Sequence, residues 1–238
     1  MKTFLVILPV IFLALMVAGY YGFVPELSTL LGADKPRDLG IHPTSQDLAS
    51  AQSKSGVNFS EITSAATPEE TLKFSGKIDI NNSFTDAEMT AMALDNPWKY
   101  NFLKGSQVKF NADGSTEMSG IFYADRLKGY AKAHGINERD IKPALDAVGL
   151  LPFNPPYYLK MNVGIQDGHM TMNISDLEIG KINLTSTVVL KENSEAIASF
   201  IQDEVINATP GVEVQSLTTS NGALNYKGSF PQTISVAH

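Results

Sequence analysis

The sequence contains no cysteine, which excludes disulfide bonds, thiol nucleophiles and thiolate metal sites, and leaves no residue to carry the lipid of a lipoprotein. Positive charge is also scarce, because 18 basic residues stand against 25 acidic ones and the net charge is −7. Binding to nucleic acid requires a concentrated basic patch, and the sequence has no long basic run. We therefore expect no nucleic-acid partner and a core stabilised by packing alone.

The chain also lacks the short motifs that build common active sites. It contains no nucleophile elbow, no phosphate-binding loop and no dinucleotide fingerprint. Its four histidines are scattered without metal-ligand spacing, and His134, beside Gly135 at a predicted helix end, is expected to be a solvated surface residue. Asp86 and Glu88 suit a helix N-terminus better than acid–base chemistry. The sequence therefore predicts no enzyme, no catalytic residue, no metal and no cofactor.

The most apolar part of the chain is an uncharged run from Thr3 to Val24. As a helix it would extend roughly 33 Å, which is enough for the hydrocarbon core of a bilayer. Tyr20 and Tyr21 suit the headgroup boundary, and Lys2 is the only charge before the run, so the N-terminus is expected in the cytoplasm. We predict a transmembrane anchor over residues 1–24. The competing interpretation is a signal peptide that is cleaved after its small residues.

Composition divides the rest of the chain in two. Residues 25–70 are rich in Ser, Ala, Gly, Asp and Pro and poor in large apolar residues, which predicts a tether. Thr44 and Asp47 resemble an N-cap pair, so a short helix is possible inside this tether. Residues 71–238 carry the alternating apolar patterns of a folded extracytoplasmic domain.

The pattern of that domain predicts an α+β fold. Gly114, Gly168 and Gly222 each follow Asp or Asn between alternating apolar runs, which is the strongest short-range signal for a β-hairpin. Thr85 and Glu88 form a capping box that begins a helix. Further helical segments separate the hairpins, so strands and helices do not alternate strictly. We predict a curved antiparallel sheet of β-hairpins packed on helices.

Methionine and aromatic residues concentrate around the first helix of the domain and its hairpins. Methionine adapts to irregular apolar shapes, so a sheet lined in this way could hold a lipid chain against a helix. The same residues could equally form an ordinary core, which any domain of two layers needs. The residues expected to line a ligand groove are Met89, Met92, Trp98, Phe102, Met118 and Phe122.

Several short segments are similar to the YpmS-like single-span bacterial proteins. They are the N-terminal span, the helix from Ser83 to Met89, the strand pair from Gln107 to Gly120 and the segment from Ile179 to Ile182. The resemblance covers about Leu72 to Phe230. It implies an extracytoplasmic domain akin to tubular-lipid-protein-like modules, with a curved antiparallel sheet against a helix, and it transfers no catalytic residue. The long tether and the region from Gly135 to Pro156 depart from that layout.

These features predict a membrane-anchored, non-catalytic extracytoplasmic domain that binds an apolar ligand, such as lipid or a lipid-linked envelope precursor. Its partner would be the membrane, through the N-terminal helix. The alternative is a protein-interaction scaffold in cell-envelope assembly, which would have an envelope protein as its partner. The ligand-binding hypothesis depends on the anchor and on the Met-rich apolar faces. The scaffold hypothesis requires only an exposed sheet edge or outer face.

Overall fold

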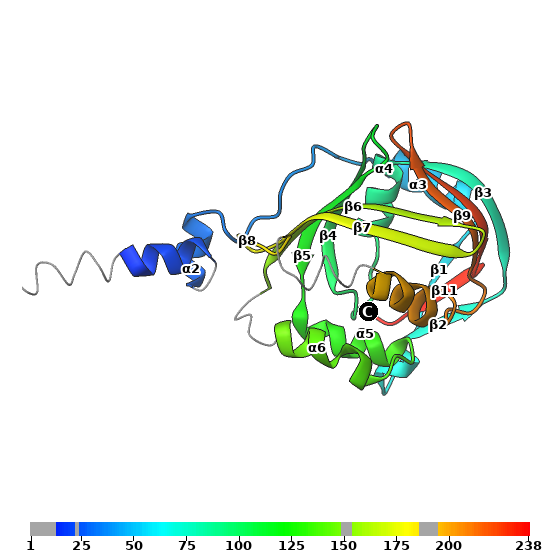
Figure 1. Ribbon diagram of the computed structural model, residues 1–238. Helices are drawn as coiled ribbons and strands as arrows, with labels where there is room; N and C mark the ends of the chain where they lie inside the picture. The colour runs from blue at the N-terminus through cyan, green and yellow to red at the C-terminus, as the bar shows by residue number, and fades with distance from the viewer. Residues whose placement is uncertain (1–12, 22–23, 149–153, 186–194) are drawn as a thin grey trace, which may run out of the picture.

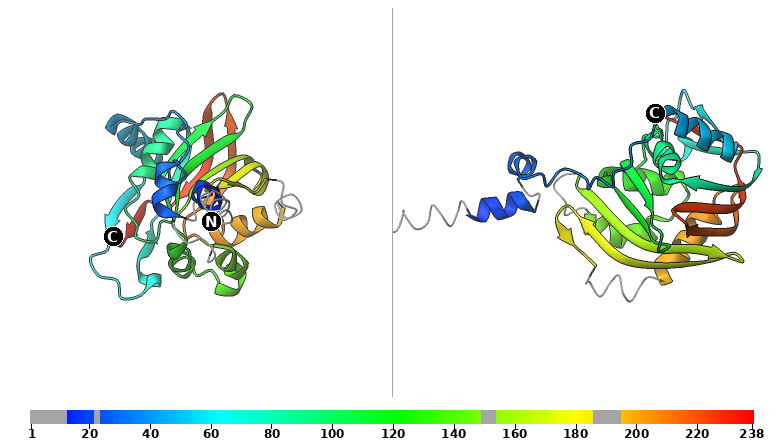
Figure 2. Two further views of the ribbon diagram at one scale, coloured as in Figure 1. Left: turned by 90° about the vertical axis from the view of Figure 1, so that its left-hand side faces the viewer. Right: turned by 90° about the horizontal axis from the view of Figure 1, so that it is seen from above.

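The computed structural model describes residues 13–21, 24–148, 154–185 and 195–238. At its N-terminal end, residues 13–20 are helical and a second helix, α2 (Pro25–Leu30), follows after a turn. The Ser28 hydroxyl donates a hydrogen bond to the Gly19 carbonyl at 2.9 Å, which joins the two helices. This helical pair projects away from the rest of the molecule (Figure 1 and Figure 2).

The predicted anchor falls only in part on the described residues. None of the helices described has the combined length and apolar character that crossing a bilayer requires. Residues 1–12, which form the first half of the predicted span, lie outside the described residues. On the described half, Leu13 and Val17 are 64% and 48% exposed. The anchor therefore stays a prediction.

The body of the molecule is built on a strongly curled antiparallel sheet that forms a half-barrel (Figure 1). The strands run in the order β3-β10-β9-β6-β5-β4, while β7 pairs with the other side of β6 and with β8. The predicted curved antiparallel sheet with helices is confirmed. The strands are β3 (Ile78–Thr85), β4 (Leu103–Phe110), β5 (Thr116–Phe122), β6 (Pro156–Gln166), β7 (His169–Ile179), β8 (Ile182–Asn183), β9 (Glu213–Ser220) and β10 (Ala223–Phe230).

The three predicted hairpins are confirmed as β4–β5, β6–β7 and β9–β10. Asp167 and Gly168 both have positive φ, at 50° and 76°, and Asn221 and Gly222 have φ of 53° and 71°. Two consecutive residues with positive φ are the requirement of the tight turn that matches the twist of paired strands. The Asp-Gly and Asn-Gly pairs therefore end these strands because other residues would be strained there.

A smaller three-stranded sheet closes one end of the half-barrel. In it β11 (Thr233–Val236) lies between β1 (Asn58–Glu61), to which it is parallel, and β2 (Leu72–Ser75), to which it is antiparallel. The chain passes from β2 to β3 within two residues, and likewise from β10 to β11. The paired ribbon of β3 and β10 therefore bends and continues as β2 and β11.

Helix α4 (Asp86–Leu94) protects the edge of the large sheet. The Thr90 hydroxyl accepts a hydrogen bond from the Val108 amide at 2.9 Å, and the Asp86 carboxylate accepts one from the Phe110 amide at 2.8 Å. Both amides belong to β4, which pairs with β5 on its other side. Covering an edge strand with a helix is one way in which proteins prevent pairing with another chain, and here it occupies the amides at the C-terminal end of β4. The capping box at Thr85 and Glu88 is formed as predicted.

The remaining helices lie at the two ends of the half-barrel. Helix α3 (Ser45–Ser55) packs on α4, whereas α5 (Leu127–Ala133), α6 (Glu138–Val148) and the helix of residues 195–206 lie together below the sheet in Figure 1. The last of these changes to a π-helical turn at η3 (Ile201–Ile206). Single turns of 3₁₀ helix occur at η1 (Pro68–Glu70) and η2 (Ala124–Arg126).

Part of the segment 25–70 is in contact with the folded body. The Arg37 guanidinium lies 3.5 Å from the centre of the Tyr158 ring and forms a 3.0 Å ion pair with Glu178. The Leu39 amide donates a hydrogen bond to the Gln107 side chain. Further along, α3 begins at Thr44 with a complete capping box, and β1 joins the small sheet. The segment thus supplies one helix and one strand to the body.

Candidate functional site

An apolar cavity of about 130 Å³ lies among α3, α4, β1, β3, β10 and β11. Its lining is hydrophobic except for one serine, and it draws on segments from both ends of the described chain. The lining residues are Ser55, Val57, Phe59, Ile80, Phe84, Met89, Met92, Leu224, Tyr226, Phe230 and Ile234.

The strand register explains why apolar side chains converge on this cavity. Phe84 of β3 lies directly opposite Leu224 of β10, and residues directly opposite each other in an antiparallel pair point to the same face. Every second residue of β10 therefore faces the cavity. Met89 and Met92 are three residues apart on α4, so they share one face of that helix.

The cavity reaches the surface beside β1. Val57, which precedes this strand, is 5% exposed, but Phe59 within the strand is 43% exposed although it also lines the cavity. The Phe59 ring thus belongs both to the cavity wall and to the exposed surface. Phe59 therefore lies where a ligand could enter.

Helix α3 is held over this region by a buried carboxylate on α4. Glu88 is 4% exposed and accepts hydrogen bonds from the Lys54 ammonium at 2.8 Å, the Ser50 hydroxyl and the Thr85 amide. Burial raises the pKa of Glu88, but these hydrogen bonds outweigh it, so the pKa lies below its usual value. The ion pair between Lys54 and Glu88 therefore joins α3 to α4.

A row of apolar side chains on the large sheet begins at a residue of the cavity wall. Tyr226, which lines the cavity, lies opposite Leu217 of β9. Leu217 lies opposite Ile165 of β6, and Ile165 lies opposite Met170 of β7. The four side chains thus form one row on a single face. Most of this row is only half-buried, since Ile165 alone is nearly inaccessible, at 3% exposure.

The six residues predicted to line a groove fall into three places. Met89 and Met92 line the cavity. Met118 of β5 lies between Val108 of β4 and Leu159 of β6, and Phe122 lies at the end of β5. Neither Met118 nor Phe122 lines the cavity. The walls of this cavity therefore include Met89 and Met92 but not Met118 or Phe122.

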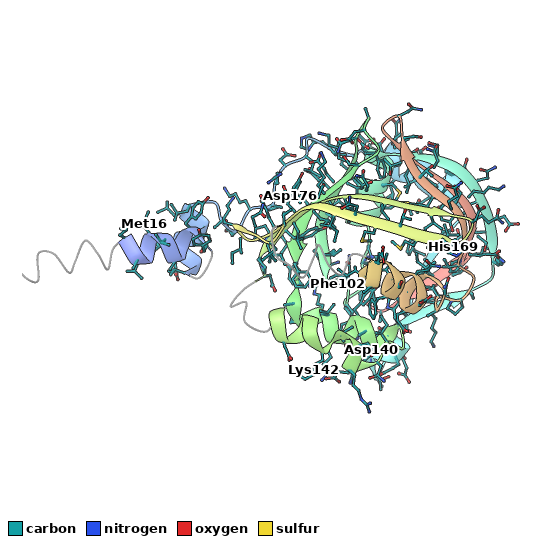
Figure 3. All side chains as sticks on the ribbon, in the orientation of Figure 1. Met16, Phe102, Asp140, Lys142, His169 and Asp176 are labelled. Carbon is teal, nitrogen blue, oxygen red and sulfur yellow. The ribbon has the colours of Figure 1, made fainter. Side chains whose placement is uncertain are left out.

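Trp98, Phe102 and Phe122 belong instead to an aromatic cluster around Tyr130 of α5. The Phe102 ring lies 4.8 Å from the Tyr130 ring and 5.9 Å from the Phe122 ring. Trp98 is 4% exposed and lies 5.6 Å from Tyr130. Figure 3 places Phe102 between the sheet and the helices below it. This cluster joins the sheet to α5, so its packing is that of a core.

His134 differs from the prediction of a solvated surface residue. Its ring stacks on Tyr130 at 4.2 Å and lies 5.5 Å from Trp98. Burial lowers the pKa of His134, against the effect of its hydrogen bond to the Tyr130 carbonyl, and burial raises the pKa of Tyr130 to about 12. The helix does end at this residue, as expected, but tertiary packing leaves the side chain half-buried.

Part of the cavity wall lies in the predicted tether and was not predicted from the sequence. Val57 and Phe59 come from a segment of low apolar content, and only their spacing of two residues hints at a strand. The residues that β10 supplies to the wall could be predicted from the sequence, because every second residue after Gly222 lies on one face of the strand. Among these residues are Leu224, Tyr226 and Phe230. What the sequence did not reveal is that these two segments meet.

No family model, no curated protein and no solved structure matches this sequence. The resemblance to the YpmS-like proteins therefore stays a prediction.

Proposed function

We propose that this protein is a membrane-anchored, non-catalytic extracytoplasmic domain that binds the apolar end of an amphiphile, either a lipid or a lipid-linked envelope precursor. The observation that carries the proposal is the cavity between α3, α4 and β10, which is lined by apolar side chains and includes Met89 and Met92. Methionine side chains are flexible and polarizable, so they adapt to ligands of irregular shape.

The size of the cavity limits what it can hold. An engineered apolar cavity of about 150 Å³ remains dry and binds a ligand of the size of benzene. A cavity of about 130 Å³ would therefore accept the end of an acyl or prenyl chain and not a whole lipid. The rest of the chain would follow the row of apolar side chains on the sheet beyond Tyr226.

The N-terminal segment supports the membrane part of the proposal. Its described half exposes large apolar side chains, and such a surface is unfavourable in water. In Figure 1 this segment projects from the body, which would leave the half-barrel outside the bilayer.

The topology can be tested with protease added to intact spheroplasts. We expect the body to be digested without lysis, because residues from Pro25 onward would lie outside the cytoplasm. Digestion only after lysis would show that the orientation is wrong. An antibody against a cytoplasmic marker protein checks that the spheroplasts stay intact.

Met92→Trp tests ligand binding directly. The larger ring should fill space that the ligand would occupy, so native mass spectrometry of the detergent-extracted full chain should show loss of a lipid-sized mass that the parent protein carries. The melting temperature should change little, because no close-packed neighbour is displaced. In an ordinary core, the same change would overpack the site by about 1 to 3 kcal/mol.

Leu94→Trp is the matched control, because Leu94 lies on the same helix, is 50% exposed and does not line the cavity. It should leave the retained mass unchanged. The full chain is needed, since a fragment that starts at Glu70 would lack Val57 and Phe59 of the cavity wall. A parent protein without lipid, together with a large fall in melting temperature for Met92→Trp, would refute the proposal.

One observation favours the scaffold alternative. All four residues of β1 are exposed, and within the described residues this strand pairs with β11 on one side only. An exposed strand edge can accept an extended segment of another protein. If the parent protein carries no lipid, this edge becomes the better candidate for function.

A further inference from the structure

Strands β6 and β7 form a long ribbon with one apolar and one polar face. On one face, residues of β6 lie directly opposite residues of β7, and all of them are apolar or aromatic. The pairs on this face are Tyr157 with Ile179, Leu159 with Leu177, Met161 with Ile174, Val163 with Met172 and Ile165 with Met170. The other face carries polar pairs such as Asn162 with Asn173 and Lys160 with Asp176. The strand register therefore separates the side chains of the ribbon by polarity.

The apolar face of this ribbon is not part of a core cluster. None of the three clusters found among the described residues includes a residue of β6 or β7. Tyr157 and Ile165 are buried, at the two ends of the face, but the other side chains on it are only half-buried. An extended apolar surface that the protein leaves partly open is typical of a ligand-binding groove or an interaction site.

The two ends of the apolar face lead to different parts of the molecule. At one end, Ile165 lies opposite Leu217 of β9, and Leu217 lies opposite Tyr226 of the cavity wall. At the other end, a Cβ atom added to Gly180 would lie 3.7 Å from the Tyr21 carbonyl oxygen. The N-terminal helices thus approach the sheet where β7 ends, as Figure 1 shows. The face therefore extends from the predicted membrane anchor to the cavity.

The length of the face discriminates between apolar ligands. From Tyr157 to Ile165 the face measures roughly 26 Å along β6, at a rise of about 3.3 Å per residue. The hydrocarbon core of a bilayer is about 30 Å thick and contains two leaflets, so one acyl chain of a membrane lipid extends about 15 Å. A ligand that covered the face and also filled the cavity would need a longer chain. A polyprenyl chain of many isoprene units has the required length.

We infer that the apolar face of β6 and β7 and the cavity together bind one long polyprenyl chain. Its end would lie in the cavity, and its head group would lie beside the N-terminal helices. This inference rests on the proposed function, which leaves open the choice between a lipid and a lipid-linked precursor. An acyl chain of ordinary length would leave part of the face uncovered, so the burial of apolar surface favours the longer chain.

Competition between two anionic lipids tests this choice. The full chain in dodecyl maltoside would be incubated with equal amounts of undecaprenyl phosphate and dioleoyl phosphatidylglycerol, and native mass spectrometry would measure the retained masses. We expect the undecaprenyl phosphate adduct to predominate. Farnesyl phosphate, which has the same head group and a shorter chain, should be retained less in a parallel incubation.

The outcomes of this competition separate the inference from the proposed function. Preference for phosphatidylglycerol, or equal retention of undecaprenyl and farnesyl phosphate, would overturn the inference and leave the proposed function standing. Retention of none of the three lipids would contradict both. The competition uses the parent protein, so it decides the question even if a variant of the ribbon is unstable.

Ile174→Asn tests the apolar face itself, because Ile174 is half-buried in the middle of the ribbon and does not line the cavity. It should weaken the binding of undecaprenyl phosphate about tenfold, since several methylene groups of the ligand would lose an apolar contact. Farnesyl phosphate, which would occupy the cavity alone, should bind as before. Thr171→Asn is the matched control, because Thr171 lies on the polar face of the same strand and is exposed. Undiminished binding of undecaprenyl phosphate to Ile174→Asn would overturn the inference.

Discussion

Replacing Trp98 with alanine is expected to lower the free energy of unfolding by about 3 to 5 kcal/mol, as is usual for truncation of a large aromatic residue in a core. Trp98 is 4% exposed and packs with Leu72 and Val236. Its Nε1 donates a 3.1 Å hydrogen bond to the Thr71 hydroxyl, which is itself buried. The change would open a void and remove one of the two hydrogen bonds of the buried Thr71 hydroxyl, which would keep only its bond to the Pro68 carbonyl, and both effects are destabilising.

Calorimetry of the full chain in a mild detergent would measure this effect. In a chain of this size, each kcal/mol shifts the melting temperature by about 2 to 4 °C, so we expect a fall of about 10 °C. Trp98→Phe should cost less, because it keeps most of the packing and loses only the hydrogen bond. If Trp98→Ala instead left the melting temperature unchanged and abolished lipid binding, Trp98 would be a ligand contact, as the sequence predicted.

Local features of this fold could be predicted because they depend on neighbouring residues. The turns at Gly168 and Gly222 need positive φ at two consecutive positions, and Asp-Gly and Asn-Gly are the pairs that tolerate it. The capping boxes at Thr44 and Thr85 likewise use residues three positions apart. Such signals are complete within a few residues of sequence.

Contacts between distant segments could not be predicted in this way. Ser60 of β1 and Ser235 of β11 are 175 positions apart, yet their hydroxyl groups lie 2.6 Å from each other. Nothing near either residue specifies this pairing, because it depends on how the whole chain closes. The cavity wall that includes Val57 and Phe59 therefore has no signature in the local sequence.

The chemical type of a residue also could not show whether its side chain lines the cavity or packs in the core. Met92 and Trp98 are both large and apolar and are only six positions apart, but one lines a cavity and the other fills a packed cluster. The difference arises because α4 ends between them, which directs the second residue toward β2 and α5. The same reasoning explains His134, which the helix C-terminus would leave in solvent if Tyr130 and Trp98 did not cover it.

Replacing Gly228 with alanine is expected to disrupt the sheet wall behind the cavity. A Cβ atom at this position would lie 2.1 Å from the carbonyl oxygen of Glu213 on β9, and real Cβ atoms do not approach backbone so closely. The clash falls at the bulge where the register of β9 and β10 shifts, so the backbone on both strands would have to move. We expect a loss of about 3 kcal/mol, at the upper end of the range for overpacking.

Gly164→Ala on β6 is the matched control, because its added Cβ would meet only ordinary contacts, the closest being the Leu217 carbonyl oxygen at 3.4 Å. Alanine is favoured over glycine inside a strand by about 0.5 to 1 kcal/mol, so this variant should be as stable as the parent or slightly more stable. Calorimetry would compare the two. Equal melting temperatures would mean that the bulge at Gly228 yields without cost, and the wall formed by β9 and β10 would then be too compliant to hold a cavity of defined shape.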